Sequence, residues 1–155
     1  MTARFAIRPV GKGERAAWEP LWRGYQTFYE VALSAEVTDK VWERLHDPAE
    51  PMFILGAYVD GKLTGIVHYL FHRSMWTVGN YCYLQDLFVA GEARGLGLGR
   101  ALIEAVYDGA QCRGKPRLLV DAGVEHIGAR ALRQAGGAFR LHSVSQSLLS
   151  RPTTR

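Results

Sequence analysis

The sequence contains little that would tie the protein to a membrane, a metal or an oxidising compartment. Its apolar runs, of which MFILGAYV is typical, are much shorter than the stretch of about 20 residues that crosses a bilayer. The opening MTARFAIRPV lacks the apolar core and the cleavage site of a signal peptide. Only two cysteines occur, Cys82 and Cys112, and their spacing matches no metal-binding motif. These shortages predict a cytoplasmic protein with free thiols, no bound metal and no membrane partner.

Clusters of positive charge are also missing. The chain has 19 Lys and Arg against 15 Asp and Glu, a formal net charge of +4. Its basic residues are scattered, whereas nucleic-acid-binding surfaces concentrate basic and aromatic side chains on one face. We therefore expect no nucleic acid as a partner, and a small anionic ligand for which a mild positive charge suffices.

What is present is the pattern of a single α/β domain spanning residues 1–155. The chain has no linker, repeat or low-complexity segment, and this length can bury one core. The strand-like alternation of ARFAIRPV precedes two helical patterns, an aromatic stripe over 18–29 and TDKVWERLHD. Thr38 is the expected N-cap of the second helix.

Strands and helices continue in the rest of the chain. Asp60-Gly61 joins PMFILGAYV to KLTGIVHYLFHR, and this dipeptide between apolar runs predicts a hairpin. YCYLQDLFVA is a further strand, and it leads into a glycine loop, a helix near Leu98, the strand PRLLVDA, the helix IGARALRQAG and a last strand. The order β-α-α-β-β-β-α-β-α-β predicts an α/β fold with a mixed central sheet flanked by helices.

The glycine loop RGLGLGR, residues 94–100, is the strongest functional signal. A strand that enters a helix through glycines exposes the unpaired N–H groups of the helix N-terminus, where the helix dipole favours an anion. Glycine leaves that backbone accessible, and Arg94 and Arg100 add charge-assisted contacts to phosphate. The loop therefore predicts a diphosphate ligand.

Two common phosphate motifs do not fit this loop. A Walker loop needs Lys-Ser/Thr where Arg100-Ala101 stands, and the third glycine of G-x-G-x-x-G is absent. Asp121, however, ends the next strand at about the distance of a ribose-binding carboxylate. A dinucleotide-binding enzyme therefore stays open as an alternative.

The loop and its neighbours resemble the GNAT superfamily of acetyl-CoA-dependent N-acetyltransferases. Arg94-Gly95-Leu96-Gly97-Leu98-Gly99 matches the family signature R/Q-x-x-G-x-G/A, YLQDLFV is similar to the family's fourth strand, and GRALIEAV to the helix after its loop. GYQTFYE and HRSMWTVGNYCYLQDLFV are similar to a bacterial branch related to spermidine/spermine and histone acetyltransferases. The resemblance covers residues 3 to about 118. It implies the GNAT fold, acetyl-CoA as co-substrate and a homodimer.

The resemblance also implies which residues hold acetyl-CoA. The backbone of the fourth strand, at Leu87, Phe88 and Val89, would pair with the pantetheine arm like an added strand. The CoA pyrophosphate would lie against the loop, which consists of Arg94, Gly95, Leu96, Gly97, Leu98, Gly99 and Arg100.

Acetyl transfer needs a base for the amine and an acid for the leaving thiolate. The resemblance implies a carboxylate or an ordered water on the fourth strand as the base, and a tyrosine on a later helix as the acid. Gln85, where many relatives carry Glu, can hold a water but cannot take a proton. Asp86 is the nearest carboxylate, and a structural cap or sheet-edge partner is its alternative role. Strict alternation places Gln85, Leu87 and Val89 on one face and Asp86 on the other, unless a bulge intervenes.

Candidate acceptor-binding residues come from two segments. Tyr29 and Glu30 end the aromatic helix, where the family places its acceptor, and Glu30 would attract a cationic amine. His68 lies on a strand from which it would line the same pocket, and a core or surface position is its alternative role.

The resemblance ends in the tail. The family expects an ARALYD helix carrying the tyrosine acid and a GF-x-x-Y strand, whereas this chain reads GARALRQAGGAFRLHSVSQSLL and has no tyrosine after Tyr107. Codons for Val120 to Leu149, read one base later with free wobble bases, can spell WTQESSTSARALYDKLAARSGFIQYRKAF, which restores both segments in register. We infer that residues 119–155 are a frameshifted C-terminus, with Arg133 near the place of the tyrosine.

The sequence therefore predicts an N-acetyltransferase that moves acetyl from acetyl-CoA to a primary amine. The acceptor is expected to be a polyamine-like or amino-acid-like small molecule rather than a protein. Two alternatives remain. One is a CoA-binding GNAT-like module without efficient catalysis, motivated by Gln85 and the missing tyrosine, and the other is a dinucleotide-binding enzyme that relies on Asp121.

Overall fold

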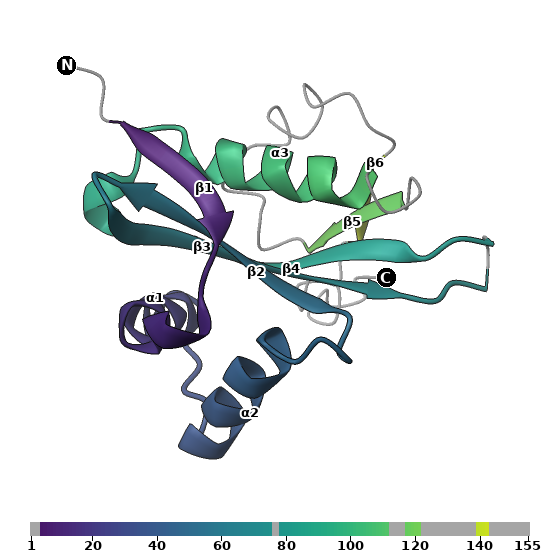
Figure 1. Ribbon diagram of the computed structural model, residues 1–155, viewed down its shortest axis with the longest axis horizontal. Helices are drawn as coiled ribbons and strands as arrows, with labels where there is room; N and C mark the ends of the chain where they lie inside the picture. Colours follow the sequence, from purple (N-terminus) through teal and green to yellow (C-terminus); the bar gives the residue numbers. More distant parts are fainter. Residues whose placement is uncertain (1–3, 76–77, 112–116, 122–138, 143–155) are drawn as a thin grey trace, which may run out of the picture.

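The computed structural model describes residues 4–75, 78–111, 117–121 and 139–142 (Figure 1). The described helices are α1 (Arg15–Phe28), α2 (Ala35–Leu45) and α3 (Leu98–Gln111). The described strands are β1 (Phe5–Pro9), β2 (Met52–Val59), β3 (Lys62–His72), β4 (Tyr81–Val89), β5 (Arg117–Asp121) and β6 (Phe139–His142). No helix in these ranges is long and apolar enough to cross a bilayer.

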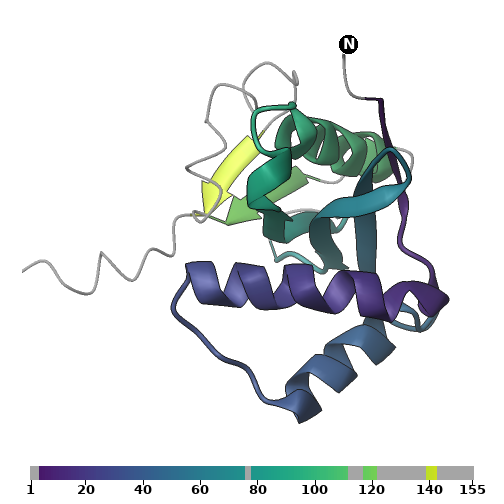
Figure 2. The ribbon, with the colours of Figure 1, turned by 90° about the vertical axis from the view of Figure 1, so that its left-hand side faces the viewer.

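The strands form one mixed sheet in the order β1-β2-β3-β4-β5-β6. β1 to β4 are antiparallel neighbours, whereas β5 pairs in parallel with β4, and β6 in parallel with β5. Figures 1 and 2 show α1 and α2 on one side of the sheet and α3 on the other. The predicted α/β fold with a mixed central sheet is confirmed. The predicted helix IGARALRQAG and Cys112 lie outside the described residues.

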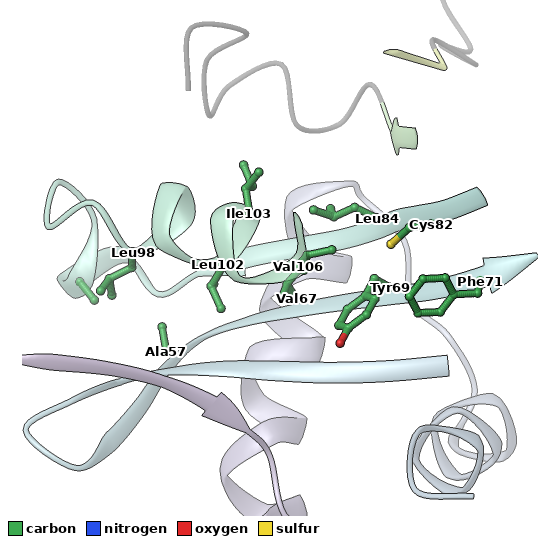
Figure 3. Close-up of a cluster of buried hydrophobic side chains, with 11 residues drawn as sticks. Ala57, Val67, Tyr69, Phe71, Cys82, Leu84, Leu98, Leu102, Ile103 and Val106 are labelled. Carbon is green, nitrogen blue, oxygen red and sulfur yellow. The ribbon is translucent and has the colours of Figure 1, made fainter. Parts of the chain in front are cut away.

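Each face of the sheet carries its own apolar core. On the α3 side, four helix residues are at most 1% exposed and belong to the core: Leu98, Leu102, Ile103 and Val106. Figure 3 shows Leu98 and Leu102 pointing from α3 toward the strands. The side chain of Cys82 is buried in this core. On the other side, tryptophans of α1 and α2 pack against β2 and β3: Trp18, Trp22 and Trp42. Spacings of three and four residues give each helix one apolar face, and the two cores hold β4 between them.

Turn and capping residues set the β2–β3 turn and the first residue of α2. Asp60 and Gly61 have φ angles of 49° and 83°, as a two-residue hairpin turn with positive φ at both positions requires. The hairpin prediction is therefore confirmed. Thr38 as the N-cap of α2 is wrong, because the helix begins one turn earlier. Ser34 is the N-cap and accepts a hydrogen bond from the Val37 N–H at 3.2 Å, while Thr38 is buried within the helix.

Candidate active site

The second half of β4 has an open edge. β4 pairs with β3 along its whole length, but its parallel pairing with β5 ends at Leu84, opposite Val120. Among the described strands, residues 85–89 therefore have a partner on one side only. An open edge presents backbone N–H and C=O groups that another extended chain can pair with.

Hydrogen bonds at the end of β4 show which of its backbone groups face this edge. The N–H of Ala90 donates to the Thr64 carbonyl at 2.8 Å, on the β3 side. Because backbone groups alternate in direction along an antiparallel strand, those of Leu87 and Val89 point to the open edge. The Val89 carbonyl indeed accepts a hydrogen bond at 3.1 Å from Nε of Arg94, which follows the strand.

A β-bulge changes which face of the sheet the β4 side chains meet. His68 of β3 is opposite Asp86, but the next pair of the ladder involves Leu84, so Gln85 is the extra residue. Leu84 and Leu87 both pack on the α3 side, and Asp86 meets His68 on the α1 side. The sequence predicted strict alternation unless a bulge intervened, and a bulge does intervene: Asp86 and Leu87 still face opposite sides, but Gln85 is the extra residue.

The glycine loop delivers the N-terminus of α3 to the same place. Gly95 and Gly97 have φ angles of 84° and 79°, in the left-handed region that residues with a Cβ avoid. The N–H of Ala101 donates to the Gly97 carbonyl at 3.1 Å, which closes the first turn. The earlier N–H groups of the helix have no acceptor within it, while Leu98, 1% exposed, anchors the turn in the core.

A pocket of about 600 Å³ lies between β4, the glycine loop and the end of α1. Its walls come from three segments: Tyr25, Phe28 and Tyr29; Leu87, Phe88 and Val89; and Ala93, Arg94, Gly95, Gly97, Leu98, Gly99 and Arg100. The structure thus brings together all the residues predicted to hold acetyl-CoA except Leu96, which is exposed beside them. Tyr29 lies in this pocket too.

Both arginines of the loop are held by neighbouring groups. Arg94 donates to the Val89 carbonyl, and its guanidinium lies 5.8 Å from the centre of the Phe88 ring. Nε of Arg100 lies 2.7 Å from Oε1 of Glu104, one turn further along α3. Their positive charge is therefore fixed at the rim of the pocket, beside the helix N-terminus, where it favours an anion.

A smaller pocket of about 210 Å³ lies on the α2 side of β4. Its lining includes Gln85, Asp86 and His68, together with apolar side chains of α1, α2, the segment between these helices and the adjoining strands: Trp22, Leu33, Val37, Val41, Leu45, Met52, Tyr69 and Leu70. Glu30 lines neither pocket and is exposed.

Three buried side chains form a hydrogen-bonded chain behind this smaller pocket. Nε1 of Trp18 lies 3.0 Å from Nε2 of His68, and Nδ1 of His68 lies 3.0 Å from Oδ2 of Asp86. Their exposed fractions are 0%, 5% and 9%. An indole N–H only donates, so Nε2 of His68 must accept and the ring proton must sit on Nδ1. The geometry assigns His68 as the neutral Nδ1–H tautomer, which donates to the Asp86 carboxylate.

The sequence analysis named His68 and Asp86 as candidate site residues but did not predict that Trp18 is hydrogen-bonded to His68. Trp18 belongs to the aromatic stripe of α1, and nothing local indicates that its N–H reaches His68, 50 positions away. Trp22, of the same stripe, is buried in the core and also lines the smaller pocket. Within the described ranges, no group of His, Cys, Asp and Glu side chains could hold a metal ion.

Comparisons with known proteins agree with this arrangement. A family model described as Acetyltransferase (GNAT) family matches residues 18–136, further into the tail than the resemblance over residues 3 to about 118. The chain is 34% identical over 115 residues to D-amino-acid N-acetyltransferase HPA3 of Saccharomyces cerevisiae (strain ATCC 204508 / S288c), covering 73% of this chain and 71% of that protein.

Solved structures share the fold. Aminoglycoside N-acetyltransferase AAC(6')-Iy in complex with CoA superposes with a TM-score of 0.72 at 18% identity, covering 94% of each chain. Ribosomal-protein-alanine N-acetyltransferase from Brucella melitensis biovar Abortus 2308 gives a TM-score of 0.64 at 24% identity, covering 76% of this chain and 79% of that chain. Given the family match and the relative with 34% identity, the chain belongs to the GNAT acetyltransferase family and is an acyltransferase.

Proposed function

We propose that the protein transfers the acetyl group of acetyl-CoA to a primary amine of a small molecule. The observation that carries this proposal is the larger pocket, where the open edge of β4 meets the N-terminus of α3. One wall offers backbone partners to an extended amide-bearing chain, and the other offers unpaired N–H groups and two arginines to a diphosphate. Acetyl-CoA carries both features.

The residues present fit this co-substrate. The backbone groups of Leu87 and Val89 that face the open edge would bind the pantetheine amides, and the N–H groups from Gly95 to Arg100 would bind the pyrophosphate. Gly95 and Gly97 carry no side chain that would cover their backbone on that wall, and their positive φ angles suit glycine. Bound acetyl-CoA supplies an activated thioester.

Acetyl transfer from acetyl-CoA to an ammonium forms one bond, breaks one bond and releases one proton. An ammonium loses one proton to become a nucleophilic amine, its nitrogen bonds to the acetyl carbon, and the carbon–sulfur bond breaks. The new amide gives up a second proton, the departing thiolate takes one, and one proton is released overall. Asp86 is the acidic residue of β4, and we propose that its carboxylate receives the proton of the ammonium. Gln85, exposed at the bulge, would hold a water beside it.

The names of similar proteins and the size of the smaller pocket both bear on the acceptor class. The yeast relative is named for D-amino acids and one structural neighbour for ribosomal-protein alanine. The small size of the pocket beside Asp86 favours a small molecule over a folded protein. The bacterial branch, the homodimer and the cytoplasmic location implied by the sequence stay predictions. The dinucleotide alternative does not accord with the family to which the chain belongs.

A second candidate function is a CoA-binding module without efficient catalysis. Two observations favour it: Gln85 cannot accept a proton, and no tyrosine follows Tyr107 in the sequence. Residues 122–138, where the family would place the acid, lie outside the described residues.

Calorimetry and a thiol-release assay separate these functions. We expect acetyl-CoA to bind and NAD not to bind, and we expect free thiol to appear when an amine panel is added. Binding of acetyl-CoA with no thiol release in the presence of any amine would instead support the CoA-binding module without efficient catalysis. Binding of NAD alone would contradict the proposed function.

A further inference from the structure

We propose that the smaller pocket is the acceptor site and that it selects primary amines with one positive charge and an apolar body of arylalkyl or pentyl size. This inference rests on the proposed acetyl transfer. It narrows the acceptor from any small-molecule primary amine to amines that carry no second cation, and so departs from the polyamine-like class expected from the sequence.

The two pockets meet on consecutive residues of one strand. Gln85 and Asp86 line the smaller pocket, and Leu87 to Val89 line the larger one. Neighbouring residues of a strand are about 3.3 Å apart. An amine nitrogen held at Asp86 therefore lies within reach of an acyl group bound along the open edge of β4 at Leu87.

Asp86 is prepared to receive one ammonium group. Its Oδ2 accepts the His68 hydrogen bond, and within the described residues Oδ1 makes none. Because Trp18 fixes His68 as the neutral tautomer, the ring neutralises none of the carboxylate's charge. A carboxylate that is 9% exposed gains from a cationic partner, since an unpaired buried charge is costly. The free oxygen is thus a site for a substrate cation.

The rest of the pocket suits an apolar body. Its walls beyond Asp86 are mainly aliphatic side chains, contributed by the helical stripe of α2 and by β2: Val37, Val41, Leu45 and Met52. An apolar cavity of about 150 Å³ is large enough to bind benzene. The 210 Å³ available here therefore accommodates an aryl ring or a five-carbon chain attached to the amine.

A second cation on the acceptor would have no acidic partner besides Asp86 among the lining residues that the structure describes. Asp86 is the one acidic side chain among the described lining residues. The distal ammonium of a diamine would have to leave water and lie against valine, leucine and methionine, and the loss of hydration of an unpaired charge disfavours that arrangement. The pocket therefore discriminates between a monoamine and the diamine of the same length.

Pentylamine and cadaverine (1,5-diaminopentane) are the matched probes, since they differ only by the terminal ammonium. We expect kcat/KM for pentylamine to exceed that for cadaverine by about tenfold or more. Phenethylamine is expected to behave like pentylamine. An equal or higher kcat/KM for cadaverine overturns the inference.

Val37→Asp tests the pocket directly. Val37 lies in the first turn of α2, is 41% exposed and lines the pocket, so an aspartate there is compatible with the helix N-terminus. The variant is expected to shift the cadaverine-to-pentylamine ratio of kcat/KM upward by about tenfold. Val31→Asp is the control, because Val31 is 48% exposed and lines neither pocket. An unchanged ratio in Val37→Asp, or an equal shift in Val31→Asp, contradicts the inference.

Failure of this inference is distinguishable from failure of the proposed function. If acetyl-CoA binds and some amines release thiol without a preference for apolar monoamines, only the pocket assignment is wrong. If no amine releases thiol, the proposed transfer itself is wrong, and the assignment that rests on it falls with it. Thermal unfolding of each variant establishes that the compared proteins are folded.

Discussion

Nδ1 of His68 on β3 lies 3.0 Å from Oδ2 of Asp86 on β4, and both side chains are buried. The contact exists because the bulge at Gln85 rotates Asp86 away from the face of Leu84. It ties the carboxylate of Asp86 to the aromatic core of α1, through Trp18. A carboxylate held in this way keeps its position without help from substrate, which is what a group acting on a small amine requires.

Asp86→Asn is expected to lower kcat by about 100- to 10,000-fold, the usual contribution of a positioned acid or base. The amide keeps the shape of the side chain but takes no proton. The Kd for acetyl-CoA, measured by calorimetry, is expected to stay unchanged because Asp86 does not line the larger pocket. Gln85→Ala is the companion variant. A large loss of kcat in Gln85→Ala together with a normal Asp86→Asn would move the role of the base to a water held by Gln85.

Trp18→Phe is expected to reduce the free energy of unfolding by about 1–3 kcal/mol more than Trp22→Phe does. Both tryptophans are buried in α1, but only the Trp18 N–H has a hydrogen-bond partner among the described residues, at Nε2 of His68. Replacing Trp18 leaves that buried nitrogen unsatisfied, whereas replacing Trp22 removes an N–H that has no partner. Urea unfolding of the two variants measures the difference, and equal losses would mean that the indole–imidazole bond contributes nothing.

Gly97→Ala is expected to weaken acetyl-CoA binding and to destabilise the protein by roughly 1–2 kcal/mol, the cost of a left-handed conformation for a residue with a Cβ. Gly97 has a φ of 79° and lines the larger pocket. The matched control is Gly91→Ala, because Gly91 has no positive φ, has open space around an added Cβ and does not line the pocket. Calorimetry with acetyl-CoA and thermal unfolding check both effects. Equal behaviour of the two variants would show that the loop conformation does not matter.

Arg8, Glu14 and Tyr58 form a hydrogen-bonded cluster that makes the free energy of unfolding depend on pH. The two hydrogen bonds from Arg8, joined by the N–H of Gly11, lower the pKa of the Glu14 carboxyl from 4.5 to about 2. Burial, and then the hydrogen bond to Glu14, raise the pKa of Tyr58 from 10.0 to about 12. Glu14 therefore stabilises the fold fully above pH 4.5 and less as the pH falls toward 2. Tyr58 stabilises it fully below pH 10 and less as the pH rises toward 12.

Two substitutions test separately the loss of stability at acid pH and the loss at alkaline pH. Glu14→Gln is expected to flatten the dependence of the unfolding free energy on pH between about 2 and 4.5, because the unfolded and folded states no longer differ in affinity for that proton. Tyr58→Phe is expected to remove the loss of stability between about pH 10 and 12. Urea unfolding across the pH range checks both. If stability still falls between about pH 4.5 and 2 in Glu14→Gln, other carboxylates are responsible for that loss.

Features that depend on a few adjacent residues were predicted from the sequence. The turn at Asp60-Gly61 follows from positive φ at both positions, and the glycine loop from the strand, turn and helix that surround it. Both are decided locally. The N-cap of α2 was misplaced at Thr38 because Ser34, one turn earlier, is an equally good cap, and only the packing of α2 on β2 selects between them.

Features that depend on how two strands register were not predicted. The position of the bulge follows from the pairing of His68 with Asp86, which no pattern within β4 specifies. The face of Asp86, its contact with His68 and the separation of the two pockets all follow from that one register shift. Most of the lining of the smaller pocket was not predicted for a related reason, since its walls come from residues that lie far apart in the sequence.

The tail offers a prediction that DNA sequencing and enzymology can test together. If residues 119–155 arise from a frameshift, the codons from Val120 to Leu149 are expected to carry the wobble bases that spell WTQESSTSARALYDKLAARSGFIQYRKAF one base later. Wobble bases are otherwise free, so agreement along the whole segment would be hard to explain by other means. Codons incompatible with that peptide contradict the inference.

Restoring the frame is then expected to raise kcat by about 100-fold or more, because it returns a tyrosine near the place of Arg133 to protonate the leaving thiolate. The Kd for acetyl-CoA should change little, since the β4 edge and the glycine loop lie upstream of the altered segment. The control replaces the restored tyrosine by phenylalanine, which keeps the corrected tail but removes the acid. If that control is as active as the restored enzyme, the gain comes from the repaired fold of the tail and not from the tyrosine.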